Sequence, residues 1–145
     1  MVSLVNFKDD LGSILSGARR LSLAVSTGDA MPQVSLMQFV VGSEFRIFMK
    51  FFSSSRKFSV LKENKSAAIC VYDNPKYTQM EGTVDFIDSV EVIDAVKNLF
   101  LEKYGDSEQM KLYLADKSLV FVEFVPKAAK CRLRESYPFG SKVLF

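Results

Sequence analysis

The sequence contains no histidine, and this absence removes several kinds of functional site. Serine and cysteine hydrolases of the usual triad type need an imidazole base. A heme iron with a proximal histidine needs one as well, and so do zinc sites built on histidine. Two isolated cysteines, Cys70 and Cys131, do not make a structural zinc site. We therefore expect any chemistry to come from a bound organic cofactor rather than from side chains alone.

Long apolar runs and a strong excess of charge are also missing, and we expect no leader segment. No apolar stretch is long enough to cross a bilayer, and residues 1–10 have no apolar run and do not resemble a signal peptide. The net charge is +2, too small to indicate nucleic-acid or membrane binding. Both cysteines lie in apolar runs, which favours free thiols in a reducing cytosol over a disulfide. We expect a cytoplasmic protein with no membrane partner and no nucleic-acid partner.

A basic patch is the one feature that could point to nucleic acid. Lysines 62, 65 and 76 extend a cationic segment near residue 56, but acidic residues 63, 73 and 81 interrupt it. A solvated surface is the better interpretation of such an interrupted run.

A length of 145 residues indicates a single domain, residues 1–145, with a sizeable core. Hydrophobic residues make up 48% of the chain, and thirteen of them are phenylalanine. That many phenylalanines either fill a barrel interior or leave apolar surface for a subunit contact or a planar ligand. No linker or low-complexity stretch divides the chain.

Apolar periodicity predicts six or seven strands and three or four helices. Strands are expected over residues 21–26, 33–41, 45–52, 66–72, 77–87, 118–125 and 127–134, and helices over 6–19, 55–63, 89–104 and 106–114. Pro126 is expected to break the last two strands apart, Gly82 to mark a bulge, and Asp88 to cap a helix. The run 66–72 is nearly all apolar and is expected to be buried on both faces.

Short turns join the predicted strands, and neither a β-α-β alternation nor a G-x-G-x-x-G motif occurs. The pattern therefore predicts an α+β fold, mainly antiparallel β, with the sheet closed into a barrel and the helices peripheral.

The sharpest local signal is the run Ser53–Lys57, where a predicted strand gives way to a helix. It holds three serines, an arginine and a lysine. A helix N-terminus offers unpaired N–H groups and a partial positive charge, and the hydroxyls and cations add donors and charge. The segment predicts a site for a phosphate monoester. A capped surface helix with two solvated cations is the alternative that this segment alone leaves open.

Three stretches carry a resemblance to a known family. They are the strand–turn–strand of residues 21–41, the run FRIFMK of residues 45–50 leading into Ser55-Arg56-Lys57, and YTQMEGTV of residues 77–84 with its Gln-x-x-Gly-Thr pattern. In this order and spacing they resemble the pyridoxamine 5′-phosphate oxidase-like family of flavin-binding split barrels, among them its short general-stress and nitroimidazole-resistance-like members. The resemblance implies a split barrel that forms a homodimer, with flavin mononucleotide (FMN) in a cleft between the subunits.

The resemblance also implies roles for particular residues. Arg56 and Lys57 would bind the flavin phosphate, with Ser55 nearby. Lys50 and Phe51 lie where the third strand of the family contacts the ribityl chain and the ring.

The remaining implied contacts concern the flavin ring. Val34, Ser35 and Leu36 match the second-strand segment that runs along the isoalloxazine. Gln79 matches the glutamine whose amide reaches the pyrimidine edge, and a carboxamide offers both the donor and the acceptor that this edge requires. An exposed strand residue with no ligand is the alternative for Gln79.

The chain departs from the family at several points. Oxidases of this family carry a basic residue at each end of the second-strand segment, where this chain has Gln33 and Gln38. The phosphate site would lose positive charge, which Lys50 would compensate in part, so the ligand could bind less tightly or be another flavin. The chain contains no tryptophan, and the aromatic and basic C-terminal motif linked to pyridoxal phosphate production is not visible. We do not expect vitamin B6 oxidase activity.

These observations predict an FMN-dependent oxidoreductase acting on an unidentified small molecule. The flavin would carry hydride or electrons while the protein supplies position and electrostatics; no catalytic side chain and no metal site is indicated. A module that holds FMN, another flavin or a deazaflavin without turnover is the alternative, and an empty dimeric barrel with a structural role is a third. The tail around residues 137–139 is expected to cover the site of the partner subunit.

Overall fold

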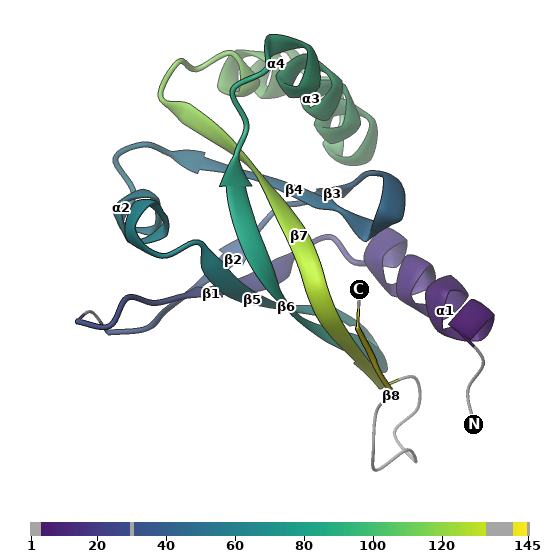
Figure 1. The fold of residues 1–145 in the computed structure, drawn as a ribbon. Coiled ribbons are helices and arrows are strands. Elements are labelled where there is room, and N and C mark those ends of the chain that lie inside the picture. The colour runs from purple at the N-terminus through teal and green to yellow at the C-terminus, as the bar shows by residue number, and fades with distance from the viewer. Residues whose placement is uncertain (1–3, 30, 133–140, 145) are drawn as a thin grey trace.

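A curled antiparallel sheet with helices at its margins makes up the molecule (Figure 1). The structure, a computed structural model, describes residues 4–29, 31–132 and 141–144. The tail around residues 137–139, expected to cover the site of a partner subunit, lies outside the described residues. The described residues form the helices α1 (Leu4–Gly17), α2 (Arg56–Glu63), α3 (Val90–Tyr104) and α4 (Glu108–Leu114), and one 3-10 turn, η1 (Ser43–Phe45). The strands are β1 (Leu21–Val25), β2 (Gln33–Met37), β3 (Val40–Val41), β4 (Ile47–Phe52), β5 (Ser66–Asp73), β6 (Lys76–Phe86), β7 (Leu119–Arg132) and β8 (Ser141–Leu144). The predicted fold class is confirmed, with eight strands in place of six or seven.

One bent segment joins the two ends of the sheet. The strand order is β2-β1-β5-β6-β7-β4-β3, all neighbours are antiparallel, and β8 pairs with the C-terminal half of β7. β2 stands at one end of this order and β3 at the other, yet only Gln38 and Phe39 separate them in the sequence. The segment predicted as one strand, residues 33–41, therefore bends from one end of the sheet to the other and completes the split barrel.

Pro126 does not divide the last long strand, contrary to expectation. Glu81 on β6 faces Ala128 on β7, whereas the next residue, Gly82, faces Pro126. Lys127 is therefore the extra residue of a β-bulge, where a proline without an N–H is tolerated. The irregularity expected at Gly82 is confirmed, and the two strands expected on either side of Pro126 are one.

The turn after β3 takes in a residue that was expected to start a strand. The Arg46 N–H donates to the Ser43 carbonyl at 3.1 Å. The two central residues, Glu44 and Phe45, have φ angles of 55° and 60°, the pattern of a type I′ hairpin turn. Phe45 thus belongs to the turn, and β4 begins at Ile47.

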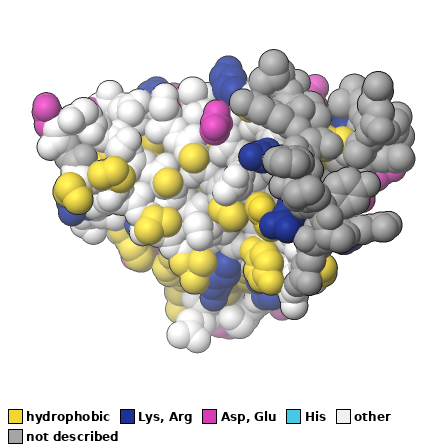
Figure 2. Space-filling view, turned by 90° about the horizontal axis from the view of Figure 1, so that it is seen from below, with side chains coloured by type: hydrophobic (Ala, Val, Ile, Leu, Met, Phe, Trp, Pro, Cys, Tyr) yellow, Lys and Arg dark blue, Asp and Glu magenta, His cyan; other side chains and the backbone are white. Residues whose placement is uncertain are grey.

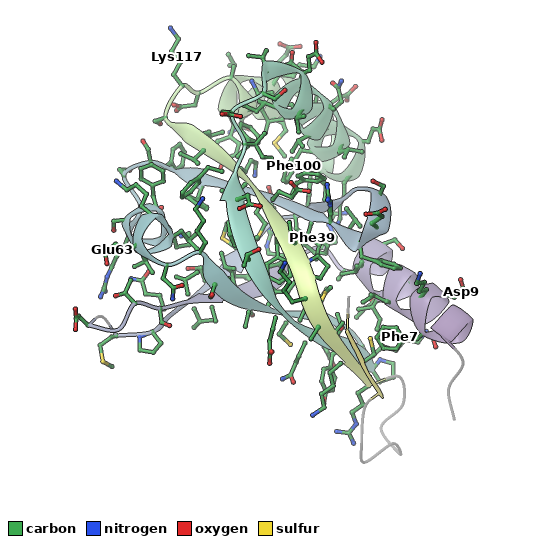
Figure 3. All side chains as sticks on the ribbon, viewed as in Figure 1. Phe7, Asp9, Phe39, Glu63, Phe100 and Lys117 are labelled. Carbon is green, nitrogen blue, oxygen red and sulfur yellow. The ribbon has the colours of Figure 1, made fainter. Side chains whose placement is uncertain are left out.

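Two apolar clusters hold the elements together. The larger cluster fills the barrel and includes the face of α1 that carries Leu11, Ile14 and Leu15. The smaller cluster lies between α3, α4 and the strands β3 and β7, and it contains Val40, Val96, Phe100, Leu114, Leu119 and Phe121. Figure 3 shows Phe100 on the side of α3 that faces the sheet. This second cluster fixes α4 close to the end of β4.

Two further expectations are corrected. Burial of residues 66–72 on both faces is wrong for the single chain: Ile69 and Val71 lie in the core, but Tyr72 is 60% exposed and Cys70 is half-buried on the opposite face. The cap of α3 is Ser89, not Asp88, because the Ser89 hydroxyl accepts from the N–H of the third helical residue at 3.4 Å.

Candidate functional site

Five of the nine predicted site residues meet in one pocket, here called the β4–α2 pocket, with a volume of about 280 Å³. The pocket is lined by Leu36, Met37, Gln38, Lys50, Phe51, Phe52, Ser55, Lys57 and Tyr113. Small-molecule sites usually have about 300–1,000 Å³. A single chain therefore offers room for part of a nucleotide-sized ligand.

Ser55 lies at the N-cap position of α2, as predicted, but its hydroxyl does not cap the helix. The backbone there is extended, and the Ser55 carbonyl accepts from the Phe58 N–H at 3.2 Å. Within the part of the chain that the structure describes, Ser55 Oγ is buried and has no hydrogen-bond partner. Buried polar atoms are normally paired, and the first N–H groups of a helix have no partner inside it. Ser55 Oγ and the N-terminus of α2 thus offer unfilled hydrogen-bonding groups at the pocket.

Lys57 adds positive charge at this end of the pocket, whereas Arg56 points elsewhere. With the Gln33 carboxamide turned so that its oxygen faces the guanidinium, that oxygen accepts from Arg56 Nε at 2.7 Å and from Nη1 at 3.2 Å. Such contacts decide how an amide is oriented. Arg56 is exposed and does not line the β4–α2 pocket, while Lys57 is half-buried and does. Of the two predicted phosphate ligands, the structure brings Lys57 to the pocket.

Lys50 also lines the pocket, next to α3 and α4. Its side chain is only 6% exposed, and its Nζ donates to Gln38 Oε1 at 3.0 Å. The same Nζ lies 4.4 Å from the centre of the Phe100 ring and 4.9 Å from that of Tyr113. Burial, assisted by the charge of Arg20, lowers the pKa of Lys50 to about 8. The predicted contact residue is therefore a desolvated amine beside the pocket.

Gln79 lies in a different pocket, on the outer face of the sheet. This outer-face pocket has a volume of about 450 Å³, and Val34 also lines it. The alternation along β2 places Val34 and Leu36 on the same, exposed side, 73% and 69% exposed, whereas the half-buried Ser35 lies on the other side and lines neither pocket. β2 thus connects the two pockets through adjacent side chains, but a single chain does not bring Gln79 to the β4–α2 pocket.

Small and apolar residues cover this outer face. The strand registers place Val34, Ala24, Ala68, Glu81 and Ala128 in one row and Leu36, Ser22, Cys70, Gln79 and Lys130 in the next. A neighbouring pocket on the same face, of about 500 Å³, shares Ala24, Ala68 and Glu81 with the outer-face pocket. Seen from below, the molecule carries hydrophobic side chains spread over this lower face (Figure 2). The face is a shallow apolar surface with few long side chains at its centre.

The predicted site residues do not include four residues that line the β4–α2 pocket: Met37, Gln38, Phe52 and Tyr113. Tyr113 comes from α4, more than fifty residues after β4 in the sequence, and reaches the pocket by packing on Phe52 with ring centres 5.8 Å apart. Gln38 was singled out only for lacking a positive charge. Its place opposite Lys50 could have been suspected, because antiparallel neighbours in a hairpin face each other. No described helix could span a membrane, and no group of metal-binding side chains occurs within the described residues.

Solved structures with this fold are numerous, although no curated protein matches the sequence. ChuZ from Campylobacter jejuni has a TM-score of 0.84 at 13% identity, over 99% of this chain and 61% of that one, so this chain spans less than two thirds of ChuZ. General Stress Protein 26 from Bacillus anthracis has a TM-score of 0.73 at 14% identity, over 96% and 98%. HutZ, described as the heme storage protein from Vibrio cholerae, has a TM-score of 0.69 at 17% identity, over 87% and 91%.

At these identities the likeness concerns the fold alone. The sequence itself matches the profile of the family described as pyridoxamine 5′-phosphate oxidase over residues 7–131, which is most of the chain. That range holds both pockets and every residue that lines them. The chain therefore belongs to the pyridoxamine 5′-phosphate oxidase-like split-barrel family.

Proposed function

We propose that the protein binds FMN and uses it as an oxidoreductase on a small molecule. The observation that carries the proposal is the β4–α2 pocket, where the unpartnered Ser55 Oγ, the N-terminus of α2 and Lys57 surround one space. A phosphate monoester carries about −1.5 to −2 charge at neutral pH and several strong acceptor oxygens. Cations, hydroxyls and a helix N-terminus are the groups that bind such an anion. The donor set fits the phosphate end of FMN.

The ring would lie along β2, toward the outer face. Val34 and Leu36 offer exposed apolar side chains there, which suit a planar heteroaromatic surface. Because the β4–α2 pocket is smaller than a whole nucleotide site, a second surface must complete it. We take that surface to be a second copy of the chain, packed against the apolar outer face, with Gln79 reaching the ring bound by its partner.

When bound, FMN would supply hydride or electron transfer. The residues of this chain would hold the phosphate, orient the ring and exclude water. An FMN carrier without turnover would use the same contacts. Anaerobic mixing of the loaded protein with NADH or NADPH separates the two: bleaching of the flavin band at a useful rate supports the enzyme, and an unchanged band supports the carrier.

Heme is the second ligand class to test, because HutZ is described as a heme storage protein. This chain has no histidine for the iron, so a tyrosine, cysteine or methionine would have to serve. A titration with hemin that gives a sharp, saturable Soret band, together with no uptake of FMN, would favour heme over our proposal.

The flavin proposal is tested by removing the positive charge at the phosphate end. Lys57→Ala should weaken FMN binding by about tenfold to a hundredfold, because a charge-assisted hydrogen bond contributes about 1.5–3 kcal/mol. Riboflavin, which lacks the phosphate, should bind the variant and the wild type equally well. Arg56→Ala should have a smaller effect, because Arg56 is engaged with Gln33.

Lys62→Ala is the matched control. Lys62 lies on the same helix, is exposed and does not line the pocket, so FMN affinity should stay as in the wild type. Fluorescence quenching of FMN gives each dissociation constant. A protein that is purified colourless and takes up no added FMN would end the proposal.

A further inference from the structure

Lys50 is the only charged residue that is buried among the described residues. Lysine is almost never buried without a partner. The burial includes the charged end of the side chain and not only its methylene groups. Lys50 Nζ is held by Gln38 Oε1 at 3.0 Å and by the rings of Phe100 and Tyr113. A buried ammonium needs a negative charge or hydrogen-bond acceptors to offset the loss of water. The groups around Lys50 therefore indicate which kind of ligand it binds.

No carboxylate provides that compensation within the described chain. The ion pairs between described residues join Arg46 to Glu123 and Lys111 to Glu108, and neither involves Lys50. The charged groups that face Lys50 are themselves cationic. Arg20, just before β1, lowers its pKa, and Lys57 at the start of α2 lines the same pocket.

The remaining neighbours are neutral and fill only part of the ammonium's capacity. An ammonium has three donors, and Gln38 takes one of them. Phe100 from α3 and the neutral phenol of Tyr113 from α4 offer ring faces. Lys50 lines the β4–α2 pocket together with Ser55, whose Oγ is unpartnered. Lys50, Lys57 and the unpartnered Ser55 hydroxyl thus line one pocket, and this combination favours the binding of an anion.

We propose that Lys50 takes up a proton as the phosphate group of a ligand enters the β4–α2 pocket, with Gln38 and Tyr113 as the residues that position its nitrogen. The neutral amine accepts one proton from solvent, and the ammonium so formed is neutralised by the phosphate; no covalent bond changes. The inference rests on the proposed function only for the identity of the ligand, since any phosphate monoester, or inorganic phosphate, would act in the same way.

The lowered pKa of about 8 supports this coupling. An arriving anion favours the charged form and moves the pKa back up, so proton uptake is largest at pH 8–9. A phosphate monoester is fully ionised there, since its second pKa is about 6, and inorganic phosphate only gains negative charge as the pH rises. Binding should therefore weaken as pH rises through this range because of the protein, not the ligand.

Lys50→Met tests the proposal, with inorganic phosphate as the probe. In phosphate-free buffer at pH 7 the variant should melt at or above the temperature of the wild type, because a buried charge without a counter-ion is replaced by an apolar chain of similar length. Adding phosphate at constant ionic strength should raise the melting temperature of the wild type at pH 7.5 and raise it much less at pH 9.5. In Lys50→Met the rise should be small at pH 7.5 and no smaller at pH 9.5, because Ser55 and Lys57 remain.

Lys50→Arg provides a second variant that keeps the charge. Arginine stays protonated at both pH values, so this variant should keep the phosphate response and lose its pH dependence. If Lys50→Met melts lower than the wild type yet keeps the full phosphate response, Lys50 has a structural role and the proposal is wrong. A phosphate response that is equal at pH 7.5 and 9.5 in the wild type would also overturn it.

FMN separates this inference from the function proposed above. If the wild type shows the pH-dependent phosphate response but does not bind FMN, the role of Lys50 is supported and the flavin proposal is wrong. FMN that binds Lys50→Met as tightly as the wild type, at both pH values, would do the reverse.

Discussion

Two glutamines stand where related oxidases carry basic residues, and each accepts hydrogen bonds from a cation. Gln33 holds Arg56, and Gln38 holds Lys50. Basic residues at these two positions would face the cations with like charge, at a cost in a partly buried setting. The loss of positive charge on β2 and the presence of Lys50 on β4 therefore belong together. The sequence indicates Lys50 as the compensating charge, and the structure adds the hydrogen bonds that the two glutamines accept.

The hydroxyl of Tyr104 stabilises the bend between β2 and β3. Phe39, in that bend, donates its N–H to Tyr104 Oη at 3.0 Å, and the hydroxyl donates to the Arg19 carbonyl at 2.7 Å. Burial raises the pKa of the Tyr104 hydroxyl, which therefore stays a donor. Tyr104→Phe should lower the free energy of unfolding by about 1–3 kcal/mol, because the N–H of a fully buried residue loses its partner.

Urea denaturation of Tyr104→Phe and the wild type measures this difference. Tyr72→Phe is the matched control, since the Tyr72 hydroxyl bonds Asn74 Oδ1 at the exposed surface and its loss should change stability by less than about 0.5 kcal/mol. Equal effects of the two substitutions would show that the Tyr104 hydroxyl does not hold the bend.

Among the elements, β6 and β7 lie in close contact at the bulge. A Cβ atom placed on Gly82 would collide with the backbone carbonyl oxygen of Val125 on β7. Backbone cannot move aside as a side chain can, so Gly82→Ala should cost about 2–4 kcal/mol of stability. The measurement is again the free energy of unfolding.

Gly28→Ala is the control for the same chemical change. Gly28 lies in the turn between β1 and β2, and a Cβ atom there would meet nothing within 4 Å. Its stability should stay close to that of the wild type. A Gly82→Ala variant as stable as Gly28→Ala would mean that the two strands separate at the bulge without cost.

Local patterns were sufficient for most elements and failed where a partner strand decides the outcome. Helix α2 and the extended Ser55 before it follow from the residues themselves. Pro126 reads as a strand break, but the extra residue of β7 that accommodates it depends on pairing with β6. Phe45 has strand propensity, yet the hairpin between β3 and β4 places it in the turn. Propensity yields to tertiary pairing in both cases.

At the scale of the whole molecule, the predicted site residues are divided between two pockets, which the single chain does not bring together. The residues near Ser55 lie together because they are neighbours in sequence and on adjoining elements. Tyr113 was missed because only the packing of α4 brings it there. Gln79 lies on an exposed strand face in the other pocket, and its contact with the flavin ring stays a prediction. No pattern in one sequence shows which of two pockets a second chain would close.

The separation of the two pockets leads to a prediction about the assembly. Leu36, at the β4–α2 pocket, and Gln79 lie in one row with Ser22 and Cys70 between them. Three strand spacings of about 4.8 Å put them roughly 14 Å apart along a curved sheet. In a two-fold dimer packed through the outer face, Gln79 of one copy would approach the ligand held at Lys57 of the other. The two residues of one site would then come from different chains.

Mixed dimers of Lys57→Ala and Gln79→Ala chains, carrying different affinity tags, test this arrangement. If Gln79 acts across the interface, one site of the mixed dimer combines both defects, and the other keeps Lys57 and Gln79 intact. The mixed dimer should then bind one FMN per two chains with wild-type affinity, while each variant homodimer binds weakly at both sites. If both residues act within one chain, every site carries one defect and no tight site remains. A protein that sediments only as a monomer at micromolar concentration would rule out the shared site altogether.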